Sequence, residues 1–154
     1  MRSYLDDVDF ETIKGRFEAF WNGELVDGPL MHIEAPRGKR VKIEFNTPED
    51  MAERWTNSNY ILKKAESYLE NTVFLGDALP WYWPNLGPNS MTAFLGGTLT
   101  FLDESTSWLF PFVGDLSTYE PRLDESNYWW RTMNDLLDSL CDVAEGRFLV
   151  GIPD

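Results

Sequence analysis

The sequence is poor in the side chains that build disulfide frameworks and zinc sites. Its 154 residues include one cysteine, Cys141, and one histidine, His32. A single cysteine excludes an internal disulfide, and one cysteine with one histidine is too small a ligand set for a structural zinc ion. Any bound metal would therefore need carboxylates or a second chain.

Positive charge and long apolar runs are also scarce. Thirteen lysines and arginines face 26 aspartates and glutamates, and the net charge of -13 disfavours nucleic acid and anionic membranes as partners. No run reaches the about 20 apolar residues of a membrane span, and residues 1–7 lack the apolar centre of a signal peptide. We therefore expect a cytoplasmic protein with no nucleic-acid or membrane partner.

Aromatic side chains are abundant instead. The chain has 7 tryptophans, 6 tyrosines and 10 phenylalanines, within an apolar share of 43%. Most of these rings must lie in the core, because each carries a large apolar surface. Length and composition predict one globular domain over residues 1–154, in which surplus rings line a pocket.

Helical periodicity predicts three long helices. The last is the clearest, because its apolar positions recur at helical spacing and Gly146 follows where a C′ glycine belongs. Cys141 lies on the apolar side of this helix and is expected in the core. Asp9 and Thr47 are the expected N-caps of the first two helices. The three helices cover residues 9–22, 48–70 and 127–145.

Short apolar runs predict strands between these helices. The order helix, strand, helix, strand, insertion, helix, strand predicts right-handed crossovers and a parallel sheet, which is the α/β class. The insertion is expected to hold a short helix over residues 90–95 and a β-hairpin. The core strands are expected near residues 30–35, 72–76 and 147–152, a further strand at 41–45, and the hairpin strands at 98–102 and 107–112.

The last expected strand, at residues 147–152, has no helix after it to cover its apolar side chains. An uncovered strand exposes an edge that pairs readily with another chain. We therefore expect self-association, or a chain that is the front part of a longer protein and has a complementary C-terminal half as its partner.

The chain also carries a series of short motifs. They are Phe20-Trp21-Asn22-Gly23, Asp27-Gly28-Pro29-Leu30, Phe74-Leu75-Gly76-Asp77-Ala78-Leu79-Pro80, Trp83-Pro84-Asn85-Leu86-Gly87-Pro88 and Gly146-Arg147-Phe148-Leu149-Val150-Gly151. In order and spacing the series resembles the N-terminal part of uroporphyrinogen decarboxylase-like proteins. It is most similar to the divergent bacterial members of that superfamily, which also contains cobamide-dependent methyltransferases.

The resemblance implies a (β/α)8 TIM barrel of about 250 residues, of which this chain would supply the first three strands. It implies the N-terminal half of a decarboxylase, which is a lyase, or of a methyltransferase, and this half would be inactive alone. The ligand would be a tetrapyrrole, a corrinoid or a methylated compound. A cobamide would be the cofactor in the methyltransferase branch, whose zinc ligands lie in the other half of the family's chain.

Barrel enzymes carry their chemistry at the carboxyl ends of strands, which points here to residues 34–40, 77–88 and Asp154. The resemblance places two arginines after the first strand, where Arg37 and Arg40 would hold substrate carboxylates. A solvated basic turn is the alternative interpretation of this pair.

Asp77 is the candidate for the catalytic group. It ends the strand at residues 72–76, where the resemblance implies an aspartate that faces pyrrole nitrogens. In an apolar pocket the pKa of Asp77 would be raised, and the adjoining Gly76 would let a ligand approach the backbone. The alternative is a loop cap that binds local backbone N–H groups.

Two further groups complete the candidate site. His32 and Glu34 alternate with apolar neighbours, so both are expected to point inward as a metal or acid–base pair, unless His32 is a buried structural histidine. Trp81, Tyr82 and Trp83 are expected to form a wall or lid over a flat ligand, or else to close the core.

Two classes of function follow from these residues. The first is the enzyme part implied by the resemblance. The second is a non-catalytic ligand-binding or assembly module that uses the aromatic loop over residues 80–88 or the open edge of the sheet.

Overall fold

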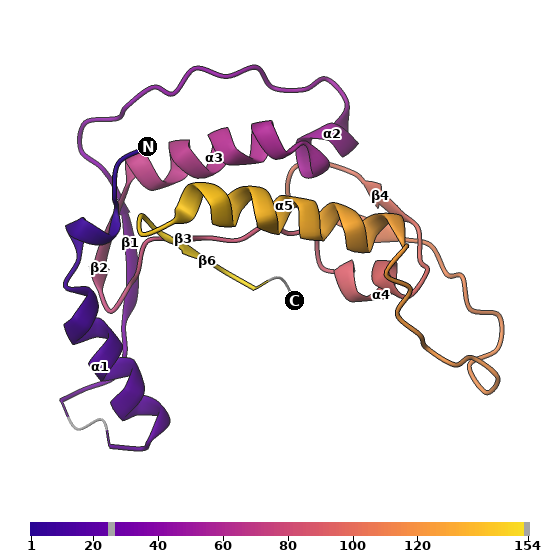
Figure 1. The fold of residues 1–154 in the computed structure, drawn as a ribbon, viewed down its shortest axis with the longest axis horizontal. Helices are drawn as coiled ribbons and strands as arrows, with labels where there is room; N and C mark the ends of the chain where they lie inside the picture. The colour runs from indigo at the N-terminus through magenta and orange to yellow at the C-terminus, as the bar shows by residue number, and fades with distance from the viewer. Residues whose placement is uncertain (25–26, 153–154) are drawn as a thin grey trace. The chain divides into compact units, whose positions relative to one another are not determined.

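The computed structural model describes residues 1–24 and 27–152, and Asp154 lies outside them. Within these residues the protein is mixed α/β, with five α-helices and three separate sheets of two short strands each (Figure 1). The contacts divide the chain into two compact units. Unit 1 contains residues 1–44, 63–82 and 141–151, and unit 2 contains residues 45–62 and 83–140 with Ile152.

Unit 1 begins with a 3-10 turn, η1 (Leu5–Asp7), followed by the helix α1 (Phe10–Trp21). Asp9 caps α1 as predicted, because its Oδ1 accepts a hydrogen bond from the Thr12 N–H at 3.2 Å. The N–H groups of Tyr4 and Leu5 donate to the Arg147 carbonyl, so the start of the chain is fastened to the segment that follows the last helix.

The strands β1 (His32–Pro36) and β2 (Thr72–Gly76) pair in an antiparallel ladder, so the predicted parallel pairing of these strands is wrong. Helix α3 (Ser58–Asn71) runs into β2 without a loop, whereas β1 is followed by residues 37–50, which form neither helix nor strand. The strand expected at 41–45 does not form in this connection. A partial barrel is not shown, because neighbouring barrel strands are parallel.

The helix expected over residues 48–70 is broken at Asn57. It forms α2 (Met51–Thr56) and α3, and the Asn57 backbone between them is extended, with ψ 108°. The Asn57 side chain accepts a hydrogen bond from the Tyr60 N–H at 3.1 Å. Asparagine side chains compete with helical hydrogen bonds in this way, so Asn57 ends one helix and starts the next.

The N-cap of α2 is Asp50, so the prediction of Thr47 as the cap is wrong. Asp50 Oδ1 accepts a hydrogen bond from the Ala52 N–H at 2.6 Å. The Pro48 carbonyl is bound instead by the Arg54 side chain at 2.7 Å, which leaves Pro48 outside the helix.

The predicted third core strand forms only at its centre, as β6 (Leu149–Val150). It pairs in parallel with β3 (Trp81–Tyr82), within the segment expected to be a loop, and with neither β1 nor β2. The backbone of Gly151 still donates to the Tyr82 carbonyl at 2.9 Å. Beyond it Ile152 is 91% exposed, so the expected buried strand does not continue.

Unit 2 contains the short helix α4 (Ser90–Phe94) and the predicted hairpin, formed by β4 (Leu99–Phe101) and β5 (Ser107–Leu109). The Phe101 ring stacks on Trp55 at a centroid distance of 5.2 Å. The Trp55 indole N–H donates to the carbonyl of Asp103, which fixes the hairpin against α2.

The last helix, α5 (Tyr128–Ala144), is confirmed at almost its predicted bounds. Met133, Leu136 and Leu140 are buried at helical spacing, and Gly146 follows with a positive φ. Cys141 is exposed, so its expected place in the core is wrong. No helix in the described part of the chain is long and apolar enough to span a membrane.

Candidate functional site

An apolar pocket of about 280 Å³ opens in unit 1 between α1 and the strands β1, β3 and β6. It brings together three of the side chains that the sequence pointed to, His32, Asp77 and Trp81. Few polar groups in a mainly apolar wall are typical of a small-molecule site. The pocket is lined by Phe17, His32, Asp77, Leu79, Trp81, Leu149, Val150 and Gly151.

Asp77 is the most buried polar group of this pocket, and its carboxylate is held by the protein itself. The side chain is 6% exposed, and the Arg16 guanidinium donates to both of its oxygens. The Met31 N–H donates to Oδ2 at 2.8 Å. Arg16 also forms an ion pair with Asp27. Asp77 therefore links α1 to the ends of β1 and β2.

The pKa of Asp77 is lowered, which is opposite to the expected direction. The hydrogen bonds from Arg16 are the largest cause, and they outweigh the desolvation that raises the pKa, with the Met31 N–H adding to the lowering. The sequence showed the apolar surroundings of Asp77 but carried no local sign that Arg16 pairs with it.

The backbone conformation requires glycine at position 76. The predicted reason for this glycine was the approach of a ligand. Gly76 lies opposite His32 in the ladder and has a φ of +67°. A Cβ atom at this position would lie 2.6 Å from the Met31 carbonyl oxygen. That carbonyl also accepts the Asp77 N–H at 2.7 Å, so the turn after β2 packs directly on the chain before β1.

His32 and Glu34 lie on one face of β1 and contact each other. The distance from His32 Nε2 to Glu34 Oε1 is 2.8 Å. The side chains are 52% and 32% exposed, and the intervening Ile33 is exposed too, so the predicted inward placement in a barrel is wrong. A two-stranded sheet leaves both faces of β1 partly open.

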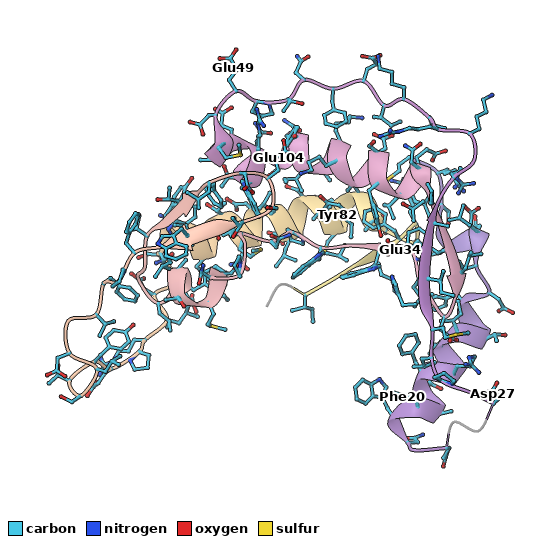
Figure 2. All side chains as sticks on the ribbon, turned by 180° about the vertical axis from the view of Figure 1, so that it is seen from behind. Phe20, Asp27, Glu34, Glu49, Tyr82 and Glu104 are labelled. Atoms are coloured by element: carbon cyan, nitrogen blue, oxygen red, sulfur yellow. The ribbon has the colours of Figure 1, made fainter. Side chains whose placement is uncertain are left out.

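Tyr68 of α3 extends this contact. Burial raises the pKa of Tyr68, and a hydrogen bond to Glu34 raises it further. The Tyr82 ring lies beside the Tyr68 ring at a centroid distance of 6.1 Å. Figure 2 labels Glu34 and Tyr82 among the side chains. Glu34 is therefore shared between His32 and Tyr68.

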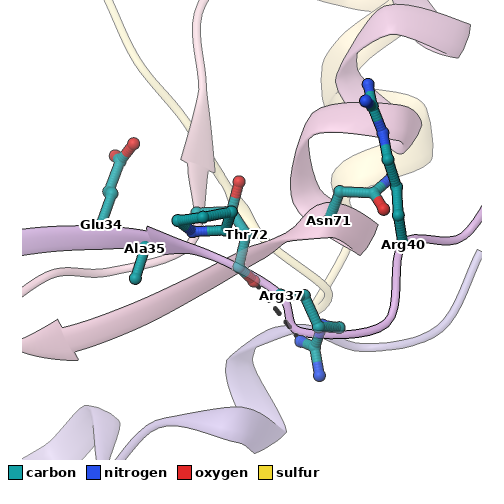
Figure 3. Close-up of a pocket in the computed structure, with 7 residues that line it drawn as sticks. Glu34, Ala35, Arg37, Arg40, Asn71 and Thr72 are labelled. Carbon is teal, nitrogen blue, oxygen red and sulfur yellow. Dashed lines mark hydrogen bonds between the residues drawn. The ribbon is translucent and has the colours of Figure 1, made fainter.

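A second, polar pocket of about 470 Å³ lies along the end of β1 and the start of β2 (Figure 3). Arg37 and Arg40 both line it, but Figure 3 shows their guanidinium groups pointing away from each other. Arg40 is exposed and has no ion pair among the described residues. The pocket is lined by Glu34, Ala35, Pro36, Arg37, Arg40, Asn71 and Thr72.

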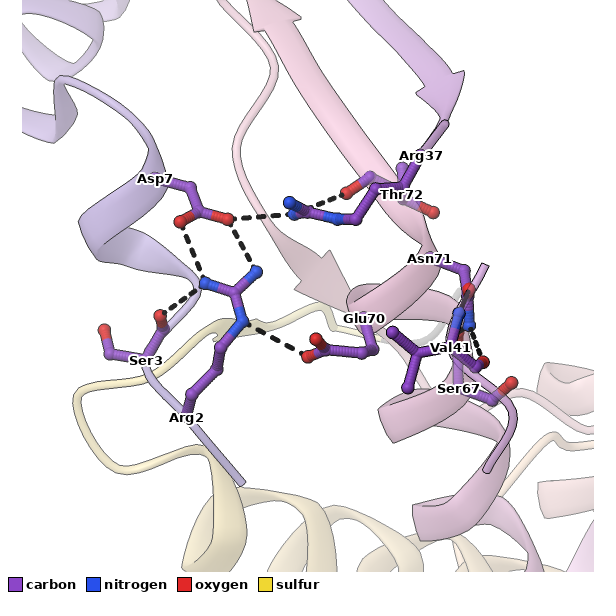
Figure 4. A network of polar contacts seen from close by, with 9 residues as sticks. All are labelled: Arg2, Ser3, Asp7, Arg37, Val41, Ser67, Glu70, Asn71 and Thr72. Carbon is purple, nitrogen blue, oxygen red and sulfur yellow. Dashed lines mark hydrogen bonds and ion pairs between the residues drawn. The ribbon is translucent and has the colours of Figure 1, made fainter. Parts of the chain in front are cut away.

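Arg37 takes part in a network that fastens η1 to the sheet (Figure 4). Its Nη2 donates to Asp7 at 3.0 Å and to the Thr72 carbonyl at 3.4 Å. Arg2 holds both Asp7 oxygens, at 2.7 and 2.8 Å, and also reaches Glu70. These hydrogen bonds, with Arg2 as the largest cause, lower the pKa of Asp7.

The aromatic segment is folded into the protein. Trp81, Tyr82 and Trp83 are all half-buried, and Pro80 and Pro84 beside them are fully buried. Of the predicted aromatic wall, Trp81 is the ring that lines the apolar pocket.

No family model, curated protein or solved structure matches this chain. Among the residues that the structure describes, no group of three or more histidine, cysteine, aspartate or glutamate side chains is placed to hold a metal ion. A functional assignment therefore depends on the geometry of the apolar and the polar pocket described above.

Proposed function

We propose that unit 1 binds a flat, largely apolar small molecule in the apolar pocket. The observation that supports this best is the meeting of Phe17, His32 and Trp81, from three separate elements, around one concave surface. A volume of about 280 Å³ is just below the usual range of ligand pockets, which starts near 300 Å³. It suits a small ring system or one edge of a larger one.

The enzymatic form of this proposal is the N-terminal half of a uroporphyrinogen decarboxylase-like or cobamide-dependent methyltransferase-like enzyme. In that form the ligand is a tetrapyrrole, a corrinoid or a methylated compound, and its carboxylates would have to extend to Arg40 in the polar pocket. The antiparallel pairing of β1 with β2 counts against the barrel of that family. Ligand binding therefore has more support than the family's chemistry.

Replacing Trp81 by leucine tests the pocket. We expect a carboxylated free-base porphyrin to quench tryptophan emission of the wild-type chain. For Trp81→Leu we expect about a tenfold weaker Kd, because the variant loses an aromatic wall worth about 1 kcal/mol beyond its buried area. Trp108→Leu is the matched control, since Trp108 is 57% exposed in unit 2.

Equal Kd values for wild type and Trp81→Leu would remove the apolar pocket as the binding site. A parallel titration with cobalamin distinguishes a corrinoid from a porphyrin, because only the favoured ring would show the Trp81 dependence.

An assembly module is the second candidate function, and exposed apolar side chains favour it. Trp21 on α1 is 79% exposed and Phe20 is 47% exposed, and Met31 just before β1 and Ile33 within it are exposed too. The Phe20 and Trp21 rings also touch, at a centroid distance of 5.2 Å, and exposed apolar side chains that lie together are typical of a contact with another chain.

We expect light scattering to give a mass above the 17.9 kDa of one chain, and Trp21→Gln to shift it towards one chain. Leu116→Gln is the matched control, because Leu116 is equally exposed, at 82%, but lies in unit 2. A wild-type monomer at high concentration would contradict the assembly function.

A further inference from the structure

We propose that His32 is the hydrogen-bond acceptor of the apolar pocket, so that its ligand must present an N–H or O–H group. This inference depends on the proposed binding function and adds to it the residue that selects the ligand. It moves the role of acceptor from Asp77, where the resemblance to the decarboxylase family had placed it, to the imidazole of His32 in the same pocket.

Asp77 is a poor acceptor for a ligand, although it lines the same pocket. Its carboxylate already accepts three hydrogen bonds, two from Arg16 and one from the Met31 N–H. The side chain is only 6% exposed. A ligand would have to compete with a guanidinium for these oxygens, and charge-assisted bonds of that kind are among the strongest in proteins.

His32 has the opposite properties. Its Nε2 is bonded to Glu34 Oε1 at 2.8 Å, while Nδ1 has no hydrogen-bond partner in the described part of the chain. An ionised carboxylate can only accept, so the proton of the neutral imidazole lies on Nε2. The nitrogen that remains, Nδ1, then carries a lone pair and accepts.

Tyr68 is a positioning residue for this arrangement. It is bonded to Glu34, and it packs its ring edge-on against Phe74 of β2 at a centroid distance of 6.1 Å. Two donors, His32 and Tyr68, thus bind one carboxylate and hold it in place. The contacts of Glu34 with His32 and Tyr68 therefore fix the tautomer of His32 in the absence of a ligand.

The chemistry of the acceptor defines the class of ligand. A flat ring with an acidic N–H, such as a pyrrole or indole, or with a hydroxyl, such as a phenol, can satisfy Nδ1. The N-methyl or O-methyl analogue leaves Nδ1 without a partner, which weakens binding although the apolar contacts remain.

Indole and 1-methylindole are the matched probes, because they differ at the donor alone. At about pH 8, where a histidine side chain is neutral, we expect the wild-type chain to bind indole about fivefold more tightly by ligand-observed NMR. His32→Phe should keep a ring at this position and bind both probes equally. Glu34→Gln should reduce the preference, and Glu44→Gln, an exposed glutamate of unit 1, should keep it.

The single histidine gives a second readout that needs no ligand. The ¹⁵N shifts of its two imidazole nitrogens report the tautomer directly, and we expect the Nε2-protonated form in wild type and a mixture in Glu34→Gln. A wild-type Nδ1-protonated form would overturn the inference. Equal binding of indole and 1-methylindole would also overturn the inference, but the apolar pocket would remain a binding site. Binding of neither indole would overturn the proposed function as well.

Discussion

Gly76→Ala is expected to destabilise the protein by about 2–4 kcal/mol, because two separate costs coincide at this position. The φ of +67° is unfavourable for any residue with a Cβ atom, and the new Cβ would lie 2.6 Å from the Met31 carbonyl oxygen. A backbone oxygen cannot rotate away as a side chain can. Urea unfolding followed by tryptophan fluorescence measures the loss.

Two other glycines of unit 1 separate these costs. Gly23 has a φ of +72° with nothing within 4 Å of a new Cβ, so Gly23→Ala should lose only about 1–2 kcal/mol from the backbone conformation. Gly15 lies inside α1 with open space around it, and Gly15→Ala should stabilise the helix by up to about 1 kcal/mol. If Gly76→Ala lowers the free energy of unfolding no more than Gly23→Ala does, the Met31 carbonyl has moved to make room for the new Cβ atom, and the predicted steric cost is wrong.

Asp77→Ala is expected to cost about 2–4 kcal/mol, because it leaves the Arg16 guanidinium and the Met31 N–H without their acceptor in a largely buried place. Asp77→Asn should lose less, since one oxygen remains to accept. Asp27→Asn is the matched control, because Asp27 pairs with the same arginine but is 64% exposed. Its unfolding free energy should stay close to that of the wild type.

The contribution of Asp77 also depends on pH in a defined direction. Its pKa is lowered in the folded state from the ordinary value of 3.8, so the stabilisation is fully present above that value. It is lost as the pH falls through the lower pKa of the folded protein. The difference in stability between wild type and Asp77→Asn should therefore shrink below about pH 4.

The same variant tests whether Asp77 is a ligand group. The geometry leads us to expect that Asp77→Asn lowers the melting temperature and keeps porphyrin binding, as a structural pair would. Lost binding with an unchanged melting temperature would restore Asp77 to the site and remove His32 as its replacement.

The sequence by itself determined those structural elements whose stabilising contacts lie between residues close together in the chain. The apolar spacing of α5, the Asp9 cap, the glycine after α5 and the hairpin turn each involve residues within a few positions of one another. The energies that form them are local, so the sequence alone was sufficient to predict them.

Only the tertiary structure decided which strands and which side chains pair with each other. Whether β1 and β2 run parallel or antiparallel depends on the path of the whole connection between them, and its residues 37–50 have no periodicity to read. The Arg16 and Asp77 side chains are 61 positions apart, and a carboxylate at the end of an apolar strand looks the same in the sequence with or without its arginine. Hydrophobic patterning specifies which face is buried but not what covers it, because burial of apolar area has no direction. The direction of pairing, the pKa of Asp77 and the choice of acceptor in the pocket therefore follow from the fold.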